Sequence, residues 1–135
     1  MTRFAIDAPT ALRIVAEGTT IAEGHQLVGP AILRSHALGA LYREVREGRR
    51  DERDGRAALE GIAGLRIRLL GDRVSRATAW RLALERGLDD PALAEYVAVA
   101  VLQADVLVTD DPAIAAIADG AVPVLGWDAF AREAA

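Results

Sequence analysis

The sequence predicts an α/β protein built around a parallel β-sheet, and three observations support this fold class. Short apolar segments alternate along the chain with longer segments of helical periodicity. The apolar segments at residues 3–6 and 105–109 lead into aspartates, Asp7 and Asp111, and a helix is predicted directly behind each aspartate. Pro112 occupies the first helical position after Asp111, as is typical of helix starts. Strands joined through helices pair in parallel with right-handed crossovers, so the alternation indicates one parallel sheet.

In the first half of the chain, glycine and proline mark the ends of the predicted elements. The expected elements are a strand at residues 3–6, a helix at 8–17 ending at Gly18, a strand at 26–29, a helix from Pro30 through about Glu47 closed by Gly48, and a helix at 51–65. The last of these helices has one apolar face, so it should pack against the rest of the protein.

The second half continues the alternation. The expected elements are a strand at 67–70 ended by Gly71, a helix at 75–86 capped by Ser75 and stopped by Gly87, a helix begun by Asp89-Asp90-Pro91 and running through Gln103, a strand at 105–109, a helix at 112–118, a strand at 122–125 and a short helix from Trp127. The run from Tyr96 to Leu102 is apolar on all sides, which predicts a buried helix. The helices at 51–65 and 75–86 are additional to those that a simple strand–helix alternation needs. Such an additional helical segment often forms a clip over the domain or a dimer surface.

Composition excludes several classes of protein. With 135 residues, of which 52% are hydrophobic, the chain is expected to form a single domain, 1–135, with a proper core. The absence of cysteine excludes a disulfide framework and a thiolate metal site, and two histidines are too few for a histidine-rich zinc site. No apolar stretch is long enough to span a membrane and no signal peptide is recognisable, so we expect a cytoplasmic protein without membrane association.

Charge is distributed unevenly along the chain. Residues 34–86 carry 13 arginines and 8 acids, whereas the remainder carries 3 arginines and 12 acids. Residues 89–111 contain six acids and no basic residue. An acidic centre flanked by an arginine-rich segment suits a metal site that handles a polyanion. Solvation of helix surfaces explains the same arginines, and the charge pattern alone favours that simpler explanation.

Two aspartates that follow separate strands form the candidate site. Ligands bind outside the carboxyl ends of the strands in open α/β sheets, so Asp7 and Asp111 would meet at that edge. With Asp110 as a third acid, they would make a divalent-metal site. Aspartate is also a favoured helix N-cap residue, and capping alone explains either position. Both interpretations stay open, although the occurrence of two such aspartates favours a site.

Four segments resemble PIN-domain proteins, specifically the VapC-like toxins of toxin–antitoxin pairs. They are Phe4-Ala5-Ile6-Asp7-Ala8, Gly29-Pro30-Ala31-Ile32-Leu33-Arg34-Ser35, Ala94-Glu95-Tyr96-Val97-Ala98-Val99-Ala100 and Leu107-Val108-Thr109-Asp110-Asp111. The resemblance covers nearly the whole chain and implies a three-layer α/β/α fold with about five parallel strands. It also implies an endoribonuclease in which three or four carboxylates hold Mg²⁺ or Mn²⁺ to cleave RNA. An antitoxin protein and a homodimer are the partners that it implies.

The resemblance can be carried over residue by residue. Asp7 matches the first acid of the family, Asp111 the last, and Thr109 the hydroxyl residue just before it. His36 stands where the family usually has a glutamate, and Leu93 where it usually has an aspartate. Leucine cannot bind a metal, and histidine is a poor ligand for Mg²⁺ though acceptable for Mn²⁺. We therefore expect weak Mg²⁺ binding at best, with Mn²⁺ preferred.

Other residues are candidates to replace the missing acids. Asp90 lies nearly one helical turn before the position of Leu93, and Asp110 directly precedes Asp111, so both are further candidate metal ligands. His36 is a candidate ligand, proton shuttle or phosphate contact. A simpler alternative is that its ring only forms a hydrogen bond with Asp7 or Asp111.

Three functional hypotheses follow. The first is a VapC-like, metal-dependent endoribonuclease toxin with an atypical acid cluster. The alternative is a catalytically degenerate PIN domain that binds RNA or a protein. A receiver-like domain with strand-end acids is the third, and the complete absence of lysine disfavours it.

Overall fold

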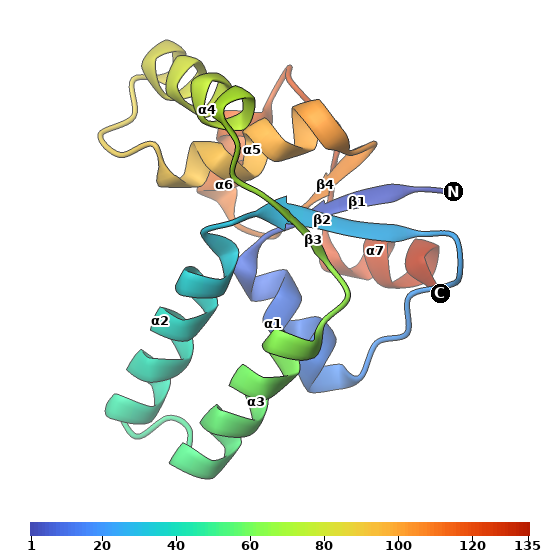
Figure 1. Ribbon diagram of the computed structural model, residues 1–135, viewed down its shortest axis with the longest axis vertical. Coiled ribbons are helices and arrows are strands. Elements are labelled where there is room, and N and C mark those ends of the chain that lie inside the picture. The colour runs from blue at the N-terminus through green and yellow to red at the C-terminus, as the bar shows by residue number, and fades with distance from the viewer.

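The computed structural model describes residues 1–135 and contains one sheet of five parallel strands (Figure 1). The strands are β1 (Arg3–Ile6), β2 (Gln26–Pro30), β3 (Arg68–Leu70), β4 (Val106–Val108) and β5 (Val124–Leu125), in the spatial order β3-β2-β1-β4-β5. Every neighbouring pair is parallel. The predicted α/β class and the five-strand parallel sheet are therefore confirmed.

Seven helices cover the two faces of this sheet. They are α1 (Ala8–Glu17), α2 (Leu33–Arg46), α3 (Glu52–Gly64), α4 (Arg73–Arg86), α5 (Ala92–Gln103), α6 (Pro112–Ala118) and α7 (Trp127–Ala134). Helices α4, α5 and α6 lie on one side of the sheet, and α1, α3 and α7 lie on the other (Figure 1). Each predicted helix and strand is present, and the differences concern where elements begin and end.

The start of α2 differs from the prediction. Pro30 is the last residue of β2 rather than the first residue of a helix, and α2 begins at Leu33. Pro30 lies beside Leu70 of β3, and the Ala31 N–H donates to the Leu70 carbonyl at 2.8 Å. A proline at the end of a strand leaves the ladder intact because little pairing follows it. Pairing with β3, a strand about forty residues further along the chain, thus extends β2 as far as Pro30.

The start of α4 also differs. Its N-cap is Asp72, whose carboxylate accepts from the Ser75 N–H at 2.8 Å, so the helix begins before the predicted cap Ser75. Hydrogen bonds from the backbone and the side chain of Ser75 lower the pKa of Asp72. The predicted strands at 105–109 and 122–125 are shorter in the structure, because β4 pairs only over Val106–Val108 and β5 only over Val124–Leu125.

The core is formed where α5 crosses the sheet. Ala94 and the run from Tyr96 to Ala100 are buried, which confirms the prediction of a buried helix. The helix packs on β1, β2 and β4. No helix is both long and apolar enough to cross a membrane.

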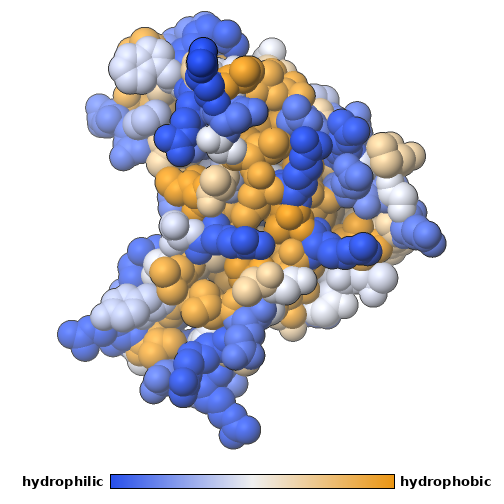
Figure 2. All heavy atoms as spheres, viewed as in Figure 1, coloured by the Kyte–Doolittle hydropathy of each residue, from blue (hydrophilic) through white to orange (hydrophobic).

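A notch lies between the α2–α3 hairpin and helix α4 (Figure 1). The α2–α3 hairpin extends away from the sheet below β2, and α4 and α5 lie above it (Figure 1). In the space-filling view the surface is hollowed between α4 and α2, with apolar side chains at its base (Figure 2). This notch lies at the carboxyl edge of the sheet, where the candidate site was predicted.

Candidate functional site

The parallel pairing of β1 with β4 brings Asp7 and Thr109 together. Ile6 lies opposite Val108, so the residues that follow them leave the sheet at the same level. The Thr109 hydroxyl donates to Asp7 Oδ2 at 2.6 Å. Asp7 is only 1% exposed and Thr109 is buried as well. A buried carboxylate is therefore held in place by a hydroxyl that comes from a separate strand.

Asp7 and Asp111 each cap the helix behind them. Asp7 Oδ1 accepts from the Thr10 N–H at 2.9 Å, and Asp111 Oδ1 accepts from the Ala113 N–H at 2.8 Å. The Asp111 N–H donates to the Thr109 hydroxyl oxygen at 3.0 Å. The two aspartates thus lie at the same sheet edge, joined through Thr109. Both aspartates therefore cap helices, and both lie at one edge of the sheet, as the parallel pairing predicted.

Asp110 occupies an exposed position next to this chain of hydrogen bonds. Its Oδ1 accepts from the Trp127 N–H at 3.2 Å, at the start of α7. A hollow of about 340 Å³, here called the Asp7 hollow, is lined by Asp7, Pro9, Thr10, Arg13, Asp110, Asp111 and Trp127. Arg13 places its guanidinium 4.5 Å from the centre of the Trp127 ring. Three carboxylates and one cation therefore border one small cavity.

His36 forms a pair with Tyr96 rather than with either aspartate. His36 Nδ1 lies 2.6 Å from the Tyr96 hydroxyl, and the two rings stack with centroids 5.6 Å apart. Burial, then the negative charges of Asp7 and Glu95, raise the pKa of Tyr96 above its ordinary range. Tyr96 was not among the predicted site residues. The available signal was a tyrosine in an apolar helix, because a buried hydroxyl needs a hydrogen-bond partner.

Leu93 and Asp90 lie at the start of α5. Leu93 is half-buried and packs against the core. Asp90 is exposed, and its Oδ1 accepts from the Ala92 N–H at 2.7 Å. Asp90 does not line the Asp7 hollow. The structure therefore brings Asp7, Asp110 and Asp111 together and leaves Asp90 apart from them.

This set of donors does not fit a Mg²⁺ or Mn²⁺ centre of the kind that the sequence resemblance implied. No group of three or more Asp, Glu, His or Cys side chains is arranged to hold a metal ion. Both oxygens of Asp7 accept hydrogen bonds within the protein, and one oxygen of Asp111 caps α6. Leu93 and His36, the latter in contact with Tyr96, occupy the two positions at which the resemblance implied further carboxylates.

No family model matches the sequence, and no curated protein does either. Among solved structures, the chain is similar to PAE2754 from Pyrobaculum aerophilum, with 24% identity over 98% of this chain and 94% of that chain and a TM-score of 0.78. It is also similar to VapBC2 from Rickettsia felis, with 10% identity over 93% of this chain and 99% of that chain and a TM-score of 0.66. The VapBC2 structure was solved bound to a DNA fragment from its promoter. These similarities confirm a PIN-like, VapC-like fold.

Proposed function

We propose that this chain, which has the VapC-like PIN fold, is an RNA-binding protein that works without the divalent-metal cluster of PIN ribonucleases. The observation that carries the proposal is the state of Asp7, a buried carboxylate whose two oxygens are bound by Thr10 and Thr109. A metal ion would have to displace or share these hydrogen bonds. The paired rings of His36 and Tyr96 and the side chain of Leu93 offer it no carboxylate in return.

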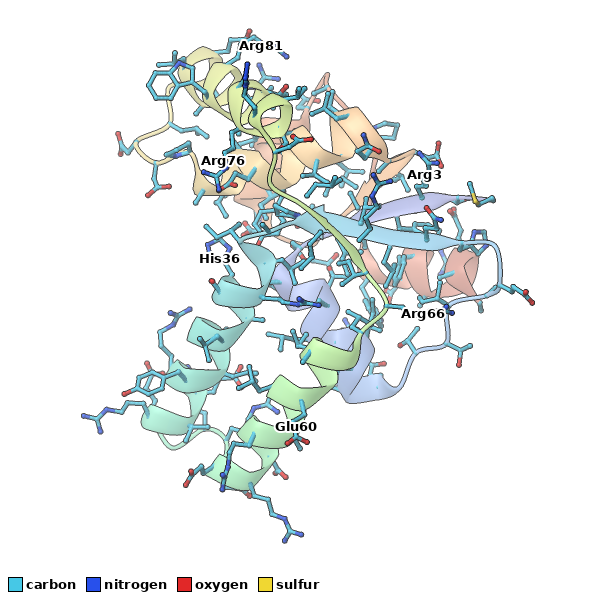
Figure 3. The ribbon with its side chains drawn as sticks, in the orientation of Figure 1. Arg3, His36, Glu60, Arg66, Arg76 and Arg81 are labelled. Atoms are coloured by element: carbon cyan, nitrogen blue, oxygen red, sulfur yellow. The ribbon has the colours of Figure 1, made fainter.

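An exposed arginine at the notch, Arg76 of α4, supports RNA as the ligand (Figure 3). Arg34 of α2 is exposed as well. Figure 3 shows Arg76 and His36 on either side of the notch at the carboxyl edge. Contacts between arginine and phosphate supply affinity for nucleic acids through release of counterions, which requires no bound metal. Arg76, which forms no ion pair, is therefore the arginine of residues 34–86 that best supports contact with phosphate at the notch (Figure 3).

Binding and cleavage of a labelled single-stranded RNA should be measured together, in EDTA and then in Mg²⁺ or Mn²⁺. We expect binding in EDTA that weakens steeply with salt, and no cleavage above that of Asp7→Asn, which keeps a capping side chain at this position. Absence of RNA binding at every salt concentration would show that the proposal is wrong.

A metal-dependent endoribonuclease is the second candidate function. It is favoured by the Asp7 hollow, which Asp7, Asp110 and Asp111 all line. Some Mg²⁺ sites use one or two protein carboxylates and complete the coordination shell with substrate phosphates. Cleavage that requires Mn²⁺ and is lost in Asp7→Asn would establish this candidate and overturn the first.

The VapC-like fold also makes an antitoxin-like protein a proposed partner and a homodimer a proposed assembly. The apolar groove between α2 and α3, about 290 Å³ in volume, is a surface available for such contacts. Leu38 and Tyr42 are exposed beside it. Co-expression with the products of neighbouring genes, followed by sedimentation of the purified protein, tests both assemblies.

A further inference from the structure

Helix α4 presents an aromatic ring and several cations to solvent. Its inner face, which includes Thr78, Ala79 and Leu82, is buried, whereas Trp80 on the outer face is 67% exposed. Arg76 precedes Trp80 by about one helical turn, and Arg81 follows it directly. A large ring left mostly in water on a well-packed helix is typical of a surface that binds something.

A hollow of about 500 Å³, here called the Trp80 hollow, lies against this ring. Its walls are Arg76, Ala79 and Trp80 of α4, Ile32 before α2, and Pro91 and Glu95 beside and within α5. Arg76 forms no ion pair, and the Glu95 carboxylate accepts no hydrogen bond from another side chain or the backbone. The Trp80 hollow thus offers an aromatic face, an unpaired cation and an unoccupied acceptor.

We propose that the Trp80 hollow is a subsite for one nucleotide of single-stranded RNA, with the base stacked on Trp80 and a neighbouring phosphate held by Arg76. The inference rests on the proposed RNA-binding function and names residues that would carry it. Stacking on an aromatic ring and contact with arginine are the two interactions by which proteins bind single strands. Glu95 can accept a hydrogen bond from the amino group of a base, as glutamate does from cytosine.

Two other ligands, a second copy of this chain and a helix of a partner protein, fit the outer face of α4 less well. A second copy packed symmetrically through α4 would bring Arg73, Arg76 and Arg81 of both copies close together, and like charges at an interface oppose association. A partner helix would use the exposed Leu84, one turn beyond Trp80, as a second apolar anchor. Leu84 does not line the Trp80 hollow, so it separates the two kinds of ligand experimentally.

The test uses the full chain and an eight-nucleotide single-stranded RNA in EDTA, with anisotropy for affinity and tryptophan fluorescence for stacking. Trp127, the second tryptophan, lines the Asp7 hollow, so the part of the quenching that Trp80→Ala abolishes is what reports on Trp80. We expect Trp80→Ala to weaken binding about tenfold or more and to abolish quenching, and Trp80→Phe to retain most of the affinity. Arg76→Ala should weaken binding and reduce the salt slope by about one. Leu84→Ala, a matched change on the same helix, should bind as the parent does.

The outcomes separate this subsite from the function on which it rests. Parent-like affinity in both Trp80→Ala and Arg76→Ala, while the parent binds RNA, removes the subsite and leaves the proposed function standing. A parent that binds no RNA removes both. A dimer that both Trp80→Ala and Leu84→Ala dissociate would identify the face as a protein interface and overturn the inference. Because Trp80 is mostly exposed, circular dichroism should show that each variant folds.

Discussion

The two halves of the carboxyl edge differ in what their side chains do for the fold. On the half formed by β1 and β4, Asp7 and Asp111 stand between a strand and a helix, and each caps that helix. The other half of the edge is covered by α2 and α5. His36 and Leu93, which stand where the resemblance implied the other two acids, lie inside these helices. The N-cap residues of those two helices make no hydrogen bond through a side chain.

The difference gives a reason why positions 36 and 93 hold no carboxylate. A capping aspartate stabilises its helix whether or not a metal is bound, by about 0.5–2 kcal/mol. A carboxylate at position 36 or 93 would have no helix start to cap, and at position 36 it would stand beside Tyr96, whose ionisation the charge of Asp7 already opposes. In this chain the acids that remain at the edge are those with a structural role of their own.

The largest expected effect tests whether Asp7 is structural. Asp7→Ala removes the cap of α1 and leaves the buried Thr109 hydroxyl without its acceptor. We expect a loss of about 3 kcal/mol in the free energy of unfolding. The lost cap contributes about 1 kcal/mol, and the Thr109 hydroxyl left without an acceptor contributes about 1–3 kcal/mol. Urea denaturation measures it. Asp7→Asn separates the two contributions, since its single amide oxygen can cap α1 but cannot also accept from Thr109. It should lose about 1 kcal/mol less than Asp7→Ala, and an equal loss in the two variants would show that the cap contributes nothing.

The second prediction concerns the half that lacks acids. His36→Glu combined with Leu93→Asp should lower the unfolding free energy of the metal-free protein by about 2 kcal/mol, because desolvated carboxylates then repel Asp7. Mn²⁺ at about a hundredfold over its dissociation constant should return about 2.7 kcal/mol, whereas the parent should gain almost nothing.

The matched control for that variant is His36→Gln with Leu93→Asn, which changes polarity without adding charge. It should be destabilised without responding to Mn²⁺ in thermal unfolding. If the parent gains as much thermal stability from Mn²⁺ as the double carboxylate variant does, then the existing carboxylates already hold a metal and the comparison fails.

The third prediction is a loss of stability at alkaline pH, caused by Tyr96 of α5. The raised pKa of Tyr96, due to its burial and to the charge of Asp7, keeps it protonated in the folded protein at a pH where the unfolded chain ionises. The unfolded state binds fewer protons above about pH 10, so stability should fall there by about 1.4 kcal/mol per pH unit. Tyr96→Phe should remove this slope. Tyr42→Phe, at an exposed tyrosine, should keep it.

The smallest effect is expected at Asp111. Asp111→Ala removes the cap of α6, a helix of seven residues, from a half-exposed position. A loss of about 1 kcal/mol in the urea denaturation experiment is expected, clearly less than for Asp7→Ala. A larger loss at Asp111 than at Asp7 would reverse the ranking of the two aspartates and show that burial of Asp7 is not what distinguishes them.

Local features of the sequence predicted most of the fold. Apolar runs, capping aspartates and glycine stops act within a few residues of one another, so the elements and the capping roles of Asp7 and Asp111 could be predicted without knowledge of the rest of the chain. Parallel pairing then predicted the shared edge, because the carboxyl ends of neighbouring strands of a parallel sheet lie together. The metal cluster expected there does not follow from local pattern, since it depends on side chains from four separate elements.

Only the tertiary structure decided the remaining features. The His36–Tyr96 pair joins residues 60 positions apart, and the continuation of β2 through Pro30 depends on β3. The exposure of Trp80 depends on which face of α4 meets α5. Propensity and capping depend on neighbours along the chain, whereas these features depend on which surfaces the folded chain brings into contact. The sequence alone therefore determined the elements and one half of the site edge, and packing between distant helices decided the chemistry of the other half.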